Sequence, residues 1–211
     1  LDALASQGLL TEVEVARSLS RAAPDAALVV LGPSTPPRSW FLAAEPRTGL
    51  TVLANRGAAG MDGLCSSAVG AALAHQRAGG GGAYGLLGDL TLLHDSNGLA
   101  IGPAEPRPDL TVVAVNNRGG AIFELLEQGG SPHREAFERV FRTDAGFDLG
   151  ALARAHGVPH ERVASPGELA AALRRPPQGL SVLEAVVPPG GYRELFDRLH
   201  AAGAAALRSA L

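Results

Sequence analysis

The sequence predicts an α/β fold in a single domain covering residues 1–211, with a doubly wound, mainly parallel sheet of about six strands flanked by helices. Two observations support this prediction. Apolar runs rich in Val, Leu and Ala recur along the chain and are nearly continuous rather than alternating, as in parallel strands that are covered on both faces. Segments with helical spacing separate these runs, and a regular alternation of strand and helix favours a parallel sheet.

The elements follow one another in chain order. Leu10, Val13 and Ala16 recur near helical spacing, which predicts the first helix at residues 11–22. The strand-like runs lie at residues 27–31, 50–54, 83–87, 110–116 and 180–187, with a weaker one at 161–163. The other helical segments lie at residues 62–77, 92–101, 120–127, 148–156, 165–175 and 192–211.

Local signals mark one helix start and one long irregular segment. Ser165 is expected to be an N-cap, with Pro166 at the first helical position and Glu168 at the third. Residues 128–147 contain glycines, a proline and a polar run, and are too long for a simple connection. Such a segment is usually a functional lid or mobile surface.

The composition is that of an ordinary soluble globular protein, with 46% hydrophobic and 18% charged residues. A net charge of −3 gives no reason to expect nucleic acid or a membrane surface as a partner. The single cysteine, Cys65, cannot form an internal disulfide, and its apolar surroundings indicate a buried structural thiol. We find neither a long apolar run nor a leader pattern, so we expect a cytoplasmic protein.

Residues 88–117 carry the strongest chemical signal. Asp89 directly follows one predicted strand, and Asn116 and Asn117 end the next one. In a parallel sheet this spacing places both groups beyond the carboxyl ends of two strands, where ligands usually bind. A carboxylate and an amide oxygen suit Mg²⁺, with Mn²⁺ as the alternative, and Mg²⁺ commonly accompanies a phosphorylated ligand. Either pair alone is usually a turn, so the signal is their joint spacing.

This stretch resembles the thiamine diphosphate motif, which begins with GDG and ends with NN, although Leu90 replaces the last glycine. Three blocks in the right order narrow the resemblance: NRGAAGMDGL at 55–64, GDLTLLHDSNGLA at 88–100 and VNNRGGAIFELL at 115–126. Together they resemble the C-terminal cofactor domain of 2-succinyl-5-enolpyruvyl-6-hydroxy-3-cyclohexene-1-carboxylate (SEPHCHC) synthases. The resemblance covers nearly the whole chain.

The resemblance implies a set of metal and diphosphate ligands. The Asp89 carboxylate, the Asn117 side-chain oxygen and the Gly119 backbone carbonyl would bind the metal. Gly88 would let the backbone approach the phosphates without a Cβ clash, and the Leu90 amide would face them. The resemblance gives Asn116 a different task, that of orienting the loop.

The resemblance also implies apolar contacts with the organic part of the cofactor. Met61 would be the bulky wedge that bends thiamine diphosphate into its V shape. Ile122 and Phe123 would form an apolar wall near the cofactor and the substrate, although core packing alone explains these two residues nearly as well.

The substrates that the resemblance implies, 2-oxoglutarate and isochorismate, carry two carboxylates each. Arg38 and Arg56 would bind carboxylates, because a guanidinium matches a carboxylate in two hydrogen bonds. The simpler alternative for both is a solvent-exposed surface arginine. Ser34 lies in the other segment that resembles a substrate contact, where Pro33 stands in place of the family's frequent Asn.

The resemblance implies half of an active site. The synthase decarboxylates 2-oxoglutarate and adds the succinyl unit to isochorismate in menaquinone biosynthesis. The glutamate that activates the cofactor is expected in the N-terminal pyrimidine-binding domain of a second subunit. We therefore expect the C-terminal part of a longer homodimeric or homotetrameric enzyme, with no catalytic residue of its own and no turnover alone. The alternatives are another thiamine enzyme, of the acetolactate synthase or 2-oxo acid decarboxylase type, and a non-catalytic diphosphate-binding module.

Overall fold

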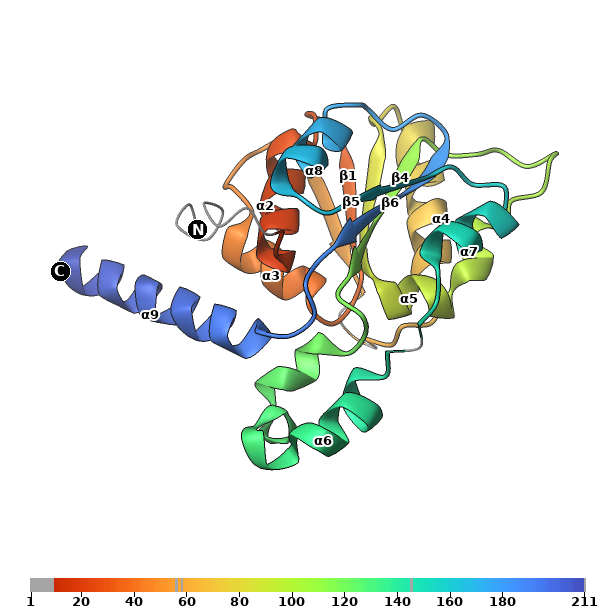
Figure 1. Ribbon diagram of the computed structural model, residues 1–211. Coiled ribbons are helices and arrows are strands. Elements are labelled where there is room, and N and C mark those ends of the chain that lie inside the picture. Colours follow the sequence, from red (N-terminus) through yellow and green to blue (C-terminus); the bar gives the residue numbers. More distant parts are fainter. Residues whose placement is uncertain (1–9, 56, 58, 145, 211) are drawn as a thin grey trace.

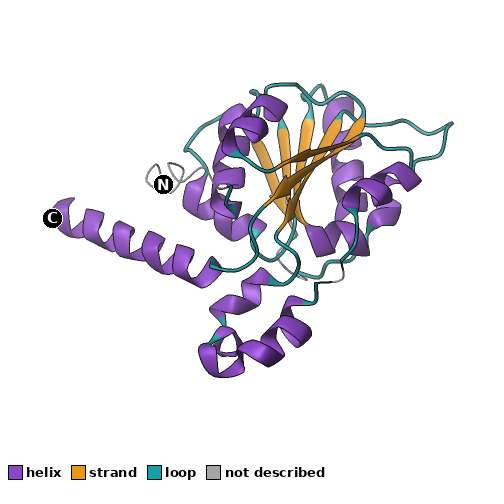
Figure 2. Cartoon of the chain, in the orientation of Figure 1, coloured by secondary structure: helices purple, strands orange, loops and turns teal. Residues whose placement is uncertain are grey.

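The computed structural model describes residues 10–55, 57, 59–144 and 146–210. Its centre is a six-stranded, all-parallel sheet in the order β2-β1-β3-β4-β6-β5 (Figure 2). The strands are β1 (Leu28–Leu31), β2 (Thr51–Ala54), β3 (Ala83–Gly88), β4 (Leu110–Asn116), β5 (His160–Val163) and β6 (Leu180–Val186). The predicted sheet is therefore confirmed, including its weaker sixth strand.

Helices cover both faces of the sheet, as predicted for a doubly wound fold. The described helices are α2 (Glu12–Ala22), α3 (Pro36–Ala43), α4 (Leu64–Arg77), α5 (Asp89–His94), α6 (Arg134–Phe137), α7 (Leu149–Ala155), α8 (Pro166–Leu173) and α9 (Tyr192–Ala210). In Figure 1, α2, α3 and α8 lie on one side of the sheet, and α4, α5 and α7 lie on the other. A separate apolar core fills each layer, and Cys65 is buried in the layer of α4, as predicted.

The predicted start of α8 is confirmed in detail. The Ser165 hydroxyl accepts the Glu168 amide at 3.2 Å, and the Glu168 carboxylate accepts the Ser165 amide at 3.1 Å. This capping box satisfies donors that the first helical turn leaves free. Pro166 occupies the first helical position, where its missing N–H costs nothing.

Two predicted helices have the wrong extent, and two helices, α3 and the short α6, are missing from the prediction. In place of a helix at 92–101, α5 begins at Asp89 and ends at His94, and the 3₁₀ turn η1 (Ser96–Leu99) follows it. The helix breaks there because the Asp95 carboxylate accepts the Ser66 amide of α4 at 2.7 Å. The segment at 120–127 is only a 3₁₀ turn, η2 (Ala121–Leu125). The unpredicted α3 begins with two prolines, which favour a first helical turn.

The expectation that every strand is covered on both faces is wrong for β2. All four of its residues are exposed. β2 lies at the edge of the sheet and pairs with β1 within the described part of the chain. Its apolar side chains Val52 and Leu53 are therefore open, as at a surface that another chain or domain covers.

Two segments lie outside the layered core. The long segment after η2 folds into short turns: η3 (Glu127–Gly129), η4 (Ser131–His133), α6 and the π-helical turn η5 (Glu138–Arg142). In Figure 1 this segment lies beyond the carboxyl ends of the strands, and α9 extends away from the core beside it. Across the described residues, no helix combines the length and the apolar character that a membrane crossing requires.

The strand order places a ligand-binding crevice at one defined point. From β1 the chain continues to β2 on one side of the sheet and then to β3 on the other. The connections that follow β1 and β3 therefore diverge toward opposite faces, and the space between them opens at the carboxyl ends of the strands. Ligands of doubly wound folds bind at such a switch point.

Candidate functional site

A cavity of about 680 Å³ occupies this switch point. The connections after β1, β2, β3 and β4 all contribute to its lining, together with the end of the segment that contains η5. Every predicted site residue that the structure describes lines this one cavity, whereas Arg56 lies outside the described residues. The structure therefore brings together residues that are up to about ninety positions apart in sequence.

Asp89 is the buried anion of the site. Its carboxylate accepts the Leu90 amide at 2.6 Å with one oxygen and the Gly119 amide at 3.0 Å with the other. Burial raises the pKa of Asp89 to about 6, although these backbone donors lower it. A nearby cation would stabilise the charged form of this carboxylate. Asp89 thus joins the loops after β3 and β4 and presents negative charge to the cavity.

Asn117 supplies an oxygen that has no partner. Its side chain is buried, and its Oδ1 atom makes no hydrogen bond within the described part of the chain. Its Nδ2 atom donates to the carboxylate of Glu12. A buried oxygen without a donor is costly, and a metal ion would satisfy it. The donor set at this point therefore fits a hard divalent cation.

Gly119 completes the loop in a conformation that requires glycine. Its φ of +113° is rarely open to other residues, and a Cβ would lie 2.0 Å from the Arg142 carbonyl oxygen. Its carbonyl accepts the Ala121 amide at 2.8 Å, which leaves a second lone pair free. Among the described residues, no group of three or more His, Cys, Asp or Glu could hold a metal. A metal here would therefore rely on neutral oxygens beside Asp89.

Asn116 orients the loop, as predicted. Its Nδ2 atom donates to the buried carboxylate of Glu184 at 2.7 Å, and its Oδ1 atom accepts the Arg118 amide at 3.1 Å. The His160 ring lies 2.9 Å from the other Glu184 oxygen. Because both ends of its amide are engaged, Asn116 is fixed in position directly before Asn117.

Apolar side chains form one wall of the cavity. Met61 is 40% exposed and Phe123 is 38% exposed, so neither is an ordinary core residue. Phe123 packs edge-on against Phe141, with ring centroids 5.7 Å apart. Ile122 is partly buried beside it. These side chains are available to an organic ligand in the cavity that Asp89 also lines.

The predicted substrate contacts Ser34 and Arg38 line the same cavity. Ser34 has a φ of 73°, and its carbonyl accepts a hydrogen bond from the exposed Arg38 guanidinium. Arg38 lies one turn into α3, so the unpredicted helix is what directs it toward the cavity. Most of its donors remain available, because a guanidinium has five N–H groups.

The long segment after η2 contributes a buried ion pair that the sequence does not reveal. Arg142 forms a salt bridge with Glu124 of η2, and both side chains are almost fully buried. The Arg142 guanidinium also donates to the Asn117 carbonyl at 3.3 Å, and its own carbonyl accepts the Gly120 amide at 2.7 Å. The segment is therefore fastened to the loop that carries Asn117. The only signal in the sequence is the run of alternating charges around Glu138.

Glu12 is a second unpredicted residue of the site. It is the first residue of α2 and is 4% exposed. Burial raises its pKa to about 7, although the polar side chains of Thr35 and Asn117 lower it. A signal for this residue exists, since Glu12 falls on the same helical stripe as Ala16 and Leu19. A carboxylate on a buried stripe requires a partner.

The chain resembles known proteins in sequence. Residues 38–185 match the model of the family "Thiamine pyrophosphate enzyme, C-terminal TPP binding domain". SEPHCHC synthases are similar in sequence: that of Saccharopolyspora erythraea is 53% identical, with 92% of the chain and 34% of the relative covered. That of Thermobifida fusca is 46% identical, with 97% and 36% covered. The chain thus spans about a third of the length of these curated relatives.

Solved structures share the fold at lower identity. Benzoylformate decarboxylase from Polynucleobacter necessarius superimposes with a TM-score of 0.65 at 21% identity, with 85% of the chain and 33% of that protein covered. The thiamine diphosphate-dependent 4-hydroxybenzoylformate decarboxylase of Rhodococcus jostii RHA1 gives 0.66 at 21% identity, with 87% and 33% covered.

Breaking the buried pair of Arg142 and Glu124 should destabilise the fold far more than breaking an exposed pair. Arg142→Ala leaves Glu124 buried without its cation, so we expect a loss of about 3–5 kcal/mol in the free energy of unfolding. Arg175→Ala is the control, because it breaks the exposed pair with Glu161, which should contribute at most about 1 kcal/mol. Urea unfolding measures both losses. Equal losses in the two variants would contradict the assigned role.

Proposed function

The chain belongs to the thiamine pyrophosphate enzymes, as a C-terminal TPP binding domain, and from this membership we propose that it forms the diphosphate- and metal-binding half of a SEPHCHC synthase. The sequence similarity to SEPHCHC synthases over nearly the whole chain supports this specific activity. The observation that carries the proposal is the convergence of the Asp89 carboxylate and the unpartnered Asn117 oxygen on one cavity.

Mg²⁺ is the proposed metal, with Mn²⁺ as the alternative. The Asp89 carboxylate, the Asn117 side-chain oxygen and the Gly119 carbonyl would hold it, a set of hard oxygen donors that suits either ion. Gly88 and Leu90 line the cavity next to Asp89. The Leu90 amide donates to the Asp89 carboxylate at 2.6 Å, so it would have to leave that oxygen to the metal before it faced the diphosphate. The metal would offset the negative charge that Asp89 and a diphosphate bring to the same place.

The remaining cavity residues are proposed to shape the cofactor and place the substrates. Met61 and Ile122 would contact the rings of thiamine diphosphate, and Phe123 would separate the reacting carbons from water. When bound, the cofactor supplies the electron sink for loss of carbon dioxide from 2-oxoglutarate. Arg38, beside Ser34, holds a substrate carboxylate. The same role for Arg56 rests on the sequence alone.

The proposed reaction joins the succinyl unit of 2-oxoglutarate to isochorismate, as in menaquinone biosynthesis. It requires a glutamate from the pyrimidine-binding domain of a second subunit, in a cytoplasmic homodimer or homotetramer. The exposed edge strand β2 and the open Met61 side chain support such a partner, since both leave apolar surface uncovered next to the cavity.

Metal-dependent cofactor binding tests the site. We expect the chain to bind thiamine diphosphate in the presence of Mg²⁺, and Asp89→Ala to weaken this binding by more than about 100-fold, because even outer partners of metal ligands contribute 10–100-fold. Isothermal titration calorimetry measures both affinities. Glu105→Ala, which removes an exposed carboxylate outside the cavity, should bind like the wild type. Unchanged binding by Asp89→Ala would exclude this metal site.

Substrate choice tests the activity. We expect a chimera, in which this chain replaces the corresponding part of the Saccharopolyspora erythraea relative, to release carbon dioxide from 2-oxoglutarate in an isochorismate-dependent manner. Product formation is followed by mass spectrometry, with pyruvate as the competing 2-oxo acid. Turnover of pyruvate would instead indicate an enzyme of the acetolactate synthase type. Cofactor binding without any turnover would favour the non-catalytic module.

A further inference from the structure

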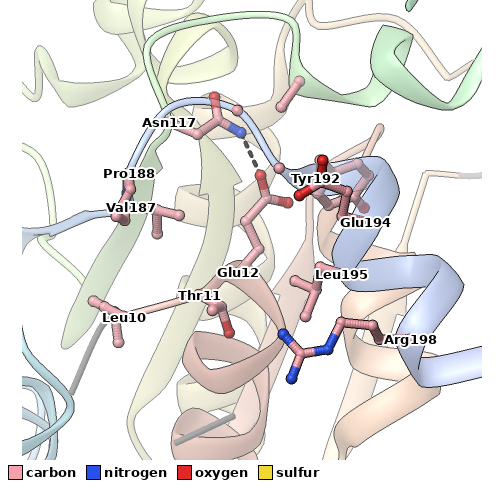
Figure 3. Close-up of a pocket in the computed structure, with 13 residues that line it drawn as sticks. Leu10, Thr11, Glu12, Asn117, Val187, Pro188, Tyr192, Glu194, Leu195 and Arg198 are labelled. Carbon is pink, nitrogen blue, oxygen red and sulfur yellow. Dashed lines mark hydrogen bonds between the residues drawn. The ribbon is translucent and has the colours of Figure 1, made fainter. Parts of the chain in front are cut away.

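A second cavity lies behind the loop that carries Asn117. It has a volume of about 320 Å³ and is enclosed by the start of α2, the residues after β6 and the start of α9 (Figure 3). It shares only Asn117 and Ala121 with the cofactor cavity. Asn117 therefore stands in the wall between the two spaces, and its side chain can be held from the far side without obstructing the site.

Glu12 holds the Asn117 side chain from this second cavity. In Figure 3 the Glu12 carboxylate rises from α2 toward the Asn117 amide, and the dashed line marks the hydrogen bond from Nδ2 to the carboxylate. The second Glu12 oxygen is buried and has no partner in the described part of the chain. Burial of a carboxylate with an unpartnered oxygen is unfavourable, so the position of Glu12 opposes the stability of the fold.

The chemistry of the two groups determines which end of the amide faces the cofactor cavity. An ionised carboxylate only accepts hydrogen bonds, whereas the amide has an NH₂ donor at one end and an oxygen acceptor at the other. In the structure the NH₂ end faces Glu12, and a Glu12 oxygen accepts its hydrogen bond. The oxygen then points away from Glu12, and it is the atom that lacks a partner.

On the basis of the proposed metal site, we propose that Glu12 is a positioning residue, which fixes the amide of Asn117 with its oxygen toward the metal. Without Glu12, the amide can rotate and present its NH₂ group, which repels a cation. Carboxylates beyond the ligands of a metal commonly fix ligand orientation in this way, and their loss lowers metal affinity by about 10–100-fold. Glu12 touches neither substrate nor metal.

The test measures metal affinity in three variants of the full 211-residue chain. Mn²⁺ is titrated in the presence of thiamine diphosphate, and free Mn²⁺ is followed by electron paramagnetic resonance. Glu12→Met keeps the length of the side chain but accepts no strong hydrogen bond, so we expect Mn²⁺ to bind about 10–100-fold more weakly. Glu12→Gln can meet the Asn117 amide in either orientation, so we expect an affinity between those of Glu12→Met and the wild type.

A double-mutant comparison separates positioning from a purely structural role. If Glu12 acts through Asn117, the variant that combines Glu12→Met with Asn117→Ala should bind Mn²⁺ no more weakly than Asn117→Ala alone. Additive losses would overturn the proposal, and so would wild-type affinity in Glu12→Met. If Glu12→Met fails to fold, as its melting curve without metal would show, Glu12→Gln decides, and unchanged affinity in that variant overturns the proposal.

The outcomes distinguish this inference from the proposed function. If the wild-type chain binds no Mn²⁺ with thiamine diphosphate, the metal site is absent and both ideas fail. If the wild type and Glu12→Met bind equally while Asp89→Ala does not bind, the metal site stands and only the role of Glu12 fails.

Discussion

The site depends on the hydrogen bond between the Gly119 amide and the buried carboxylate of Asp89. This bond joins the first residue of α5, directly after β3, to the loop after β4 across neighbouring strands of the sheet. It holds the carboxylate against the loop that carries Asn117, which has no regular structure of its own. It also requires the left-handed backbone of Gly119, which brings the Arg142 carbonyl so close that any Cβ is excluded.

The buried charges of the protein are arranged around this loop. Among the described residues, the buried charged side chains are Glu12, Asp89, Glu124, Arg142 and Glu184. Each of them bonds to residues 116–120 directly or, in the case of Glu124, through Arg142. Burial of charge normally opposes folding, so its concentration here indicates that the fold maintains one loop geometry at the expense of stability. Helix α2, the segment with η5 and strand β6 all converge on that geometry.

The sequence predicts what depends on local pattern. Continuous apolar runs identify five of the six strands, and β5 is predicted only as a weaker strand. The Asp89 and Asn117 signals lie at strand ends, where the parallel topology brings them together. Contacts between distant segments leave no such pattern. Glu12 and Asn117 are 105 residues apart, and nothing near either residue indicates the other. α3 is hidden for a different reason, because its outer side chains break the apolar periodicity, as shown by Phe41, which is 87% exposed.

The most direct test is a crystal structure of the chain grown with thiamine diphosphate and Mg²⁺. A second crystal, grown with Mn²⁺ in place of Mg²⁺, locates the metal by its anomalous scattering. The account predicts one metal in the cofactor cavity, with an Asp89 carboxylate oxygen and Asn117 Oδ1 both at about 2.0–2.1 Å from Mg²⁺. A metal bound elsewhere, or one that contacts Asp89 while the Asn117 NH₂ group faces it, would contradict the account.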